Sequence, residues 1–226
     1  MSRPAQIRFL SCFAAAYDPV ARFLGFRPLW RTMAEVARPS PGQWVLDVCT
    51  GTGGAAFDLT GRGARVIGID LAEGMLRQAQ RKDRVAGIRP SPHFVQMDAR
   101  DLAFRDRSFA LVTCVMALHE MAEAERERVL SEIARVASDR VLIAEYRVPR
   151  HRAPNVLFRL TRMYEYVESD DFQQFVANDM AKRLERVGFT VERPRDVGAF
   201  RIWPCRLSPK IARASAESGL SGSRGH

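Results

Sequence analysis

The fold is decided by the stretch Trp44-Val45-Leu46-Asp47-Val48-Cys49-Thr50-Gly51-Thr52-Gly53-Gly54. Its first six residues form an apolar run with one acid, which is typical of a buried strand. The glycines after it predict a tight turn, where the backbone can approach a ligand closely. Residues 55–61 continue as a helix. The stretch therefore predicts a strand, a glycine-rich turn and a helix, the unit from which parallel α/β sheets are built.

The sequence on either side repeats this alternation. Apolar runs predict further strands at 65–70, 93–97, 109–115 and 140–144. Helical periodicity predicts helices at 73–82 and 122–137, and at 154–187 up to Gly188. Strands that alternate with helices pair in parallel, and the helices cover both faces of the sheet. The runs 189–192 and 200–203 are expected to close this α/β sheet as a strand pair.

Length and composition predict one globular domain. The 226 residues are 46% hydrophobic, enough for one well-packed core. We expect a helical cap at 1–40, a main domain at 41–207 with a helical insertion at about 150–170, and a disordered tail at 208–226 that is rich in Ser, Gly and Ala. No apolar stretch is long enough for a membrane span.

The N-terminal run, the cysteines and the net charge indicate the cellular compartment and the kind of partner. The run Phe9–Phe13 is at the short end for a signal-peptide core, and the four cysteines lack metal-site spacing, so a cytoplasmic protein with free thiols and no bound metal is expected. The net charge of +9 comes from arginines spread along the chain, which favours solvated faces over a nucleic-acid module. Contact with an anionic surface, such as phospholipid headgroups, stays open.

Three acids are expected around one binding site. Asp47 lies in the first strand, Asp70 ends the second strand 19 residues after Gly51, and Asp98 follows the third. In an open parallel sheet, ligands bind at the carboxyl ends of the strands, and an acid after the second strand can bind both ribose hydroxyls. The glycines also fit the loose dinucleotide pattern Gly51-x-Gly53-x-x-Ala56.

A nicotinamide dinucleotide nevertheless fits this site poorly. Asp47 lies four residues before Gly51, where a carboxylate would repel a pyrophosphate. About forty residues precede the first strand, and Asp98 adds a further acid. A ligand with a cationic sulfonium, an ammonium group and an adenine suits several acids better.

Four motifs in order resemble those of the class I S-adenosylmethionine-dependent methyltransferases. They are Val45–Gly53, Ile69–Leu76, Val95–Ala99 and Asp106–Val112. The resemblance implies a Rossmann-like sheet and an enzyme that uses S-adenosylmethionine. A methyltransferase fold that only binds the nucleoside and regulates a partner is the non-enzymatic alternative.

The N-terminal region resembles the ubiquinone/menaquinone C-methyltransferases. Tyr17-Asp18 and Leu24–Arg31 are similar to that subfamily's Tyr-Asp and Gly-x-x-x-x-Trp-Arg patterns. The chain departs from the subfamily at Leu118-His119, where Arg-Asn is usual, and at 137–139, where Pro-Gly-Gly is usual. The acceptor therefore stays open between a quinol or phenolic carbon or oxygen and an amine, for example of a phospholipid.

The resemblance assigns roles at the methyl donor. The expected donor-binding residues are Asp47, Thr50, Gly51, Gly53, Asp70, Leu71, Met75, Asp98 and Ala99. Asp47 is expected to hold the ammonium group, Asp70 the ribose, and Asp98 with Ala99 the adenine. The alternative for Asp47 and Asp98 is a carboxylate that caps a turn. The alternative for Met75 is an ordinary core methionine.

Residues for the acceptor are expected after the fourth strand. His119 follows that strand and could deprotonate a phenol or enol, because an ordinary imidazole titrates near neutral pH. Tyr17, Tyr164 and Tyr166 could line a lid over a small or lipid-like acceptor, and packing is the alternative for all of them. The basic segment 150–166 could lie on a membrane surface or be a plain surface helix. The sequence predicts no oligomeric state.

Overall fold

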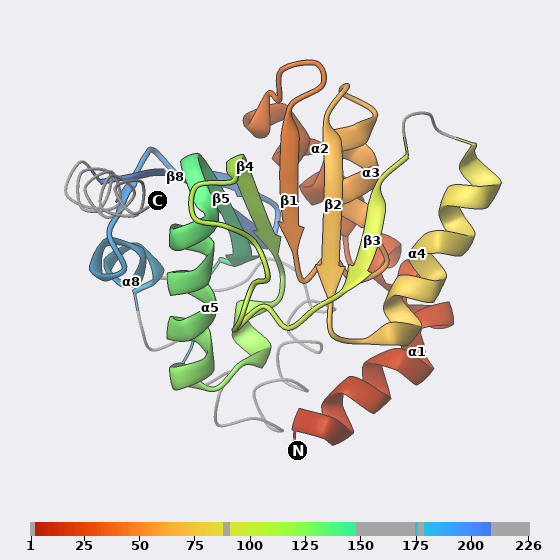
Figure 1. Ribbon diagram of the computed structural model, residues 1–226. Coiled ribbons are helices and arrows are strands. Elements are labelled where there is room, and N and C mark those ends of the chain that lie inside the picture. Colours follow the sequence, from red (N-terminus) through yellow and green to blue (C-terminus); the bar gives the residue numbers. More distant parts are fainter. Residues whose placement is uncertain (1–2, 88–90, 148–174, 176–178, 209–226) are drawn as a thin grey trace, which may run out of the picture.

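The computed structural model describes residues 3–87, 91–147, 175 and 179–208 (Figure 1). Its strands are β1 (Trp44–Val48), β2 (Arg65–Asp70), β3 (His93–Gln96), β4 (Phe109–Val115), β5 (Ala137–Tyr146), β6 (Phe189–Val191), β7 (Arg195–Val197) and β8 (Phe200–Leu207). Its helices are α1 (Arg3–Phe23), α2 (Phe26–Ala37), α3 (Gly54–Thr60), α4 (Glu73–Ala86), the short 3-10 helix η1 (Leu118–Glu120), α5 (Glu123–Val136) and α8 (Met180–Arg186). None of these helices is both long and apolar enough to cross a bilayer.

The strands form one mixed sheet in the order β3-β2-β1-β4-β5-β8-β6, with β7 paired to β8 (Figure 1). The pairings from β3 through β5 are all parallel. β8 runs antiparallel to both β5 and β6. The predicted α/β sheet with a closing antiparallel strand pair is therefore confirmed.

Helices pack on both faces of the sheet because its strands are apolar on both faces. On one face, Leu46 of β1 joins a core with α5 and α8. On the other face, its neighbour Val45 joins a core with α2 and α3. Successive side chains of a strand point to opposite faces, so adjacent apolar residues feed two separate cores. Residues 45–48 are thus buried in the middle of the molecule.

The sequence placed the fifth strand too narrowly. It predicted 140–144, whereas β5 runs from Ala137 to Tyr146. Helix α5 ends at Val136 and passes into β5 without an intervening turn. The extra residues are strand because Ala137 pairs with Phe109 and Tyr146 pairs with Phe200. The helix predicted to run up to Gly188 ends at Arg186, and Gly188 follows it with a φ of 98° that glycine permits. The part of that prediction at 154–174 lies outside the described residues. The insertion at 150–170 and the tail at 209–226 lie outside the described residues.

Helix α1 lies across the carboxyl-end edge of the sheet and packs on α4 (Figure 1). Asp18 on α1 accepts hydrogen bonds from Thr52 in the glycine-rich turn (2.6 Å) and from Lys82 on α4 (2.9 Å). Near the start of α4, the amide of Gly74 donates to Ser11. A side chain at Gly74 would overlap the Ser11 backbone, so glycine permits this close crossing. The cap helix is thereby fixed to the turn that follows β1.

Candidate functional site

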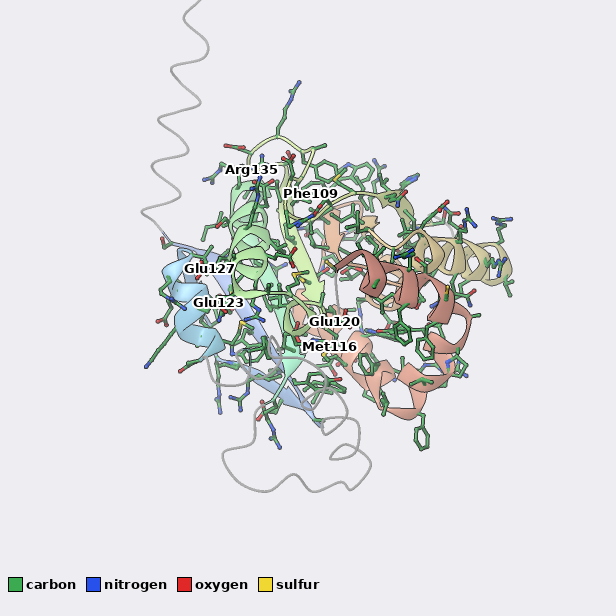
Figure 2. The ribbon with its side chains drawn as sticks, turned by 90° about the horizontal axis from the view of Figure 1, so that it is seen from below. Phe109, Met116, Glu120, Glu123, Glu127 and Arg135 are labelled. Carbon is green, nitrogen blue, oxygen red and sulfur yellow. The ribbon has the colours of Figure 1, made fainter. Side chains whose placement is uncertain are left out.

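A cavity opens at the carboxyl ends of β1, β2 and β4. It encloses about 1050 Å³, including space open to solvent. Its lining includes Asp47, Cys49, Thr50, Gly51, Thr52, Asp70, Leu71, Ala72, Met75, Met97, Ala99, Met116, Ala117, Glu120 and Met121. Figure 2 views the molecule from this edge, with Met116 and Glu120 near its centre. The cavity lies where an open parallel sheet is expected to bind its ligand.

Asp47 is the most deeply buried acid of the cavity wall, with only 1% of its surface exposed. Its two oxygens accept hydrogen bonds from the hydroxyls of Thr50 and Thr113, each at 2.6 Å. Burial raises the pKa of the Asp47 carboxyl to about 6, although both hydroxyls favour the charged form. A carboxylate held in this way is a strong partner for a cation that enters the cavity.

Asp70 holds the glycine-rich turn after β1 in place through hydrogen bonds. One of its oxygens accepts from the amide of Gly51 and the other from the amide of Ala72, each at 2.8 Å. Burial raises the pKa of this carboxyl above its ordinary value, while the amide donors oppose the rise. The carboxylate therefore fixes both the glycine-rich turn and the approach to α4, and it also lines the cavity.

The turns after β1 and β4 have unusual backbone conformations. Cys49 has a φ of 55° and Met116 a φ of 54°, in the left-handed region that costs energy for residues other than glycine. Gly51, with a φ of 55°, has open space where a Cβ would stand. A Cβ at Gly53 would lie 2.8 Å from the Phe94 ring. Backbone, rather than side chains, therefore faces the cavity at Gly51.

The expected adenine-side residues are only partly brought together. Leu71, Met75 and Ala99 line the cavity. Asp98 is not among its lining residues, and its carboxylate pairs with Arg100 at 2.6 Å. Asp98 also accepts from the Arg100 amide, as expected of a turn cap. A contact of Asp98 with adenine stays a prediction.

The inner face of α1 forms one wall of the cavity. Ile7, Leu10 and Tyr17 line it. The Tyr17 ring also meets Phe26 edge-on, at 6.5 Å between centroids. Burial and the nearby acids raise the pKa of the Tyr17 phenol, which therefore stays neutral. Tyr164, also expected at the acceptor, lies outside the described residues.

His119 is buried beside the cavity, with 5% of its surface exposed, and is not itself a lining residue. Its Nδ1 lies 2.7 Å from a carboxylate oxygen of Glu145, within hydrogen-bond distance. The other oxygen of Glu145 accepts from the amides of Ala117 and Leu118. The His119 Nε2 lies 3.9 Å from the carboxylate of Glu120, which does line the cavity. With Nδ1 as the donor in this contact, Nε2 would be the basic ring nitrogen.

Sequence reasoning missed Glu145, Glu120 and Thr113. Glu145 could have been found, because it is an acid directly after an apolar run and at the carboxyl end of a strand. Thr113 lies inside β4, and its register opposite Asp47 depends on strand pairing. No local pattern reveals that contact.

Comparison with known proteins identifies the family. The model of a methyltransferase domain matches residues 45–140. A demethylmenaquinone methyltransferase of Beutenbergia cavernae is 34% identical over 221 residues, covering 92% of this chain and 82% of the relative. An uncharacterized methyltransferase of Synechocystis is 36% identical over 156 residues, 68% of this chain and 70% of the relative.

A solved structure supports the same assignment at the level of the fold. The magnesium protoporphyrin IX methyltransferase of Synechocystis, with bound SAH, superposes with a TM-score of 0.63 at 22% identity, covering 82% of this chain and 84% of that chain. Sequence relatives, sheet order and cavity position agree. The chain therefore belongs to the class I S-adenosylmethionine-dependent methyltransferases and is a relative of the demethylmenaquinone methyltransferases.

Proposed function

We propose that this enzyme methylates a phenolic, quinol-like ring of a lipid-like acceptor, with S-adenosylmethionine as donor. The observation that supports the proposal best is the mixed chemistry of the cavity lining. Some lining residues, among them Asp47, Gly51 and Asp70, suit a charged nucleoside. Others are aromatic or methionine side chains that suit a flat apolar ring: Tyr17, Phe26, Trp30, Met116 and Met121.

The polar part of the lining fits S-adenosylmethionine by its chemistry. The buried Asp47 carboxylate suits the ammonium group of the methionine part. Asp70 stands where a carboxylate can accept from the ribose hydroxyls. The open space at Gly51 leaves room for a ligand against the backbone. When bound, the donor supplies an electrophilic methyl group on a positively charged sulfur.

The aromatic and methionine side chains of the lining suit an aromatic acceptor. Trp30 covers the start of α3, where a Cβ at Gly54 would overlap its ring. Phe26 packs 6.1 Å from Trp30 and 4.9 Å from Phe200, between ring centroids. Rigid aromatic and methionine walls align a planar ring with little loss of side-chain entropy, and alignment is the main requirement of methyl transfer.

His119 is proposed to take up the proton that methylation releases. Replacing a hydrogen of the acceptor by a methyl group sets one proton free, so a base near the cavity helps. A Glu145 carboxylate that accepts from Nδ1 would keep the His119 Nε2 basic, and Glu120, 3.9 Å from Nε2, lines the cavity. His119 would then act through Glu120 or a water rather than by lining the acceptor site.

We expect S-adenosylmethionine and its demethylated product, S-adenosylhomocysteine, to bind, and NADH not to bind. The acids around one glycine-rich turn attract the sulfonium and ammonium charges and repel a pyrophosphate. Isothermal titration calorimetry of all three ligands checks this. Heat from NADH together with none from the other two would contradict the proposed donor. The acceptor is then sought by incubating the enzyme and labelled donor with a naphthoquinol and with an ethanolamine lipid.

Donor affinity should depend on pH through Asp47. A cation in the cavity favours the ionised carboxylate, so a proton competes with the donor below the pKa of about 6. We expect affinity to be level above about pH 7 and to fall by up to about tenfold per pH unit below 6. Calorimetry between pH 5 and 8 measures this, with Asp47→Asn as the variant that loses the slope.

The free enzyme should show the opposite trend in stability. Because the pKa of Asp47 is raised in the folded state, from 3.8 to about 6, its contribution to stability is present at low pH and is lost as pH rises through 6. Thermal melts with and without donor separate the two effects. An Asp47→Asn protein with an unchanged affinity slope would assign that slope to another group.

A further inference from the structure

Helix α1 carries a second apolar stripe on the side away from the cavity. Phe9, Val20 and Phe23 expose 52%, 41% and 73% of their surfaces. Phe13 stacks on Phe9 at 5.8 Å between parallel ring centroids. Together with the exposed Ala16, these residues recur every three or four positions, which places them on one face of the helix. We call Phe9, Phe13, Ala16, Val20 and Phe23 the outer stripe.

The outer stripe is not explained by packing within the described part of the molecule. The inward face of α1 is already occupied, because Ala14 and Ala21 are buried and Ile7, Leu10 and Tyr17 line the cavity. From Phe9 to Phe23 the stripe runs for roughly 21 Å at 1.5 Å per residue. Large exposed apolar side chains gathered in one line mark a surface that meets a partner.

The charges around the stripe indicate which partner. Residues 1–38 contain six arginines and two acids, Asp18 and Glu35. The only acid of α1 is Asp18, and it faces inward to Thr52 and Lys82. Five arginines of α1, of α2 and of the position just after α2 have described side chains, and all are exposed: Arg8, Arg22, Arg27, Arg31 and Arg38. The exposed surface of α1 therefore carries apolar rings and arginines, and no acid.

We infer that the outer stripe of α1 docks the enzyme on an anionic lipid bilayer. Phenylalanines would enter the boundary between headgroups and acyl chains, and the arginines would stay among the lipid phosphates. Duplex nucleic acid shares the phosphate chemistry, but its paired and stacked bases offer no apolar layer that a line of phenylalanines could enter. The inference deepens the proposed function, because a lipid-like acceptor would reach a cavity whose wall is the same helix, about one helix diameter (~10 Å) from the bilayer.

Vesicle flotation tests the inference. Purified enzyme is mixed with phosphatidylcholine vesicles and with vesicles that also contain phosphatidylglycerol. We expect binding to the anionic vesicles that weakens as salt is raised. Phe9→Ser/Phe23→Ser should weaken this binding by at least about tenfold, because two large apolar side chains lose their burial.

A matched control comes from Val85, which is 89% exposed near the C-terminal end of α4. Val85→Ser should bind vesicles as the unmodified enzyme does. Failure of the unmodified enzyme to float with anionic vesicles, or equal flotation of the double variant, would overturn the inference. So would light scattering that finds a dimer which the double variant dissolves, since a second copy would then cover the stripe.

The readout is independent of the proposed function. Donor binding by calorimetry should be the same in all three proteins, because no substituted side chain lines the cavity. Vesicle binding without donor binding would remove the proposed donor and leave the docking surface intact. Donor binding without vesicle binding would do the reverse.

Discussion

Replacement of His119 by alanine is expected to lower turnover by roughly 10²–10⁴ while donor affinity stays unchanged. The factor is the usual contribution of a positioned acid or base. If the imidazole is the base, it must be neutral, so activity of the unmodified enzyme should also fall as acid protonates it. Transfer of labelled methyl to a naphthoquinol, followed against pH, measures both effects. Wild-type turnover in a folded His119→Ala protein would contradict the assignment.

Glu145→Gln is the sharper variant for the same assignment. The amide keeps one oxygen for the backbone amides of Ala117 and Leu118, so the turn can be retained. Its NH₂ group, however, would donate to His119 Nδ1 and move the ring proton to Nε2. A base is thereby lost without a change of shape, and turnover should fall by at least about 10². A purely structural histidine would instead give a lower melting temperature and weaken donor and acceptor together.

Replacement of Asp70 by alanine is expected to weaken donor binding by about 10- to 100-fold. A hydrogen bond to a charged group contributes about 1.5–3 kcal/mol, and tenfold corresponds to about 1.4 kcal/mol. The amides of Gly51 and Ala72 also lose their acceptor, so the glycine-rich turn loosens and the melting temperature falls. Calorimetry and thermal melts measure the two effects.

Two further variants serve as controls, one at Asp70 itself and one at a distant carboxylate. Asp70→Asn keeps an acceptor oxygen for one amide, so it should restore part of the stability while donor affinity stays low. Asp139→Ala removes a half-exposed carboxylate that pairs with Arg206 and does not line the cavity. It should leave donor affinity unchanged. Full affinity in a folded Asp70→Ala protein would show that the ribose lies elsewhere.

Much of the fold could be predicted because its signals are local. The apolar run 44–48 and the glycines after it identify β1 and the turn, and repeated alternation identifies the parallel sheet. The start of β5 could not be predicted, because Ala137 becomes strand only through its pairing with Phe109. Strand β7 could not be predicted for the same reason, because its three residues become strand through pairing with β8.

The candidate site divides in the same way. Asp47, Gly51 and Asp70 belong to one short motif, so their meeting at a strand edge follows from the topology rule. Thr113 lies 66 residues from Asp47, and Glu145 lies 26 from His119, so these contacts exist only once the sheet is assembled. The sequence could thus locate the residues expected to bind the donor. The partners of Asp47 and His119 that come from distant strands could not be located, because they depend on strand pairing.

The attachment of α1 has a consequence for how the chain is made. The helix is held by Thr52, Gly74 and Lys82, all synthesised after it. Asp18 precedes Lys82 by 64 residues. Because ribosomes add about 5–20 residues per second, Lys82 is synthesised roughly 3–13 s after Asp18. Throughout that interval both of its apolar faces are uncovered. A nascent chain of this enzyme therefore offers its first helix to cellular chaperones before it can fold.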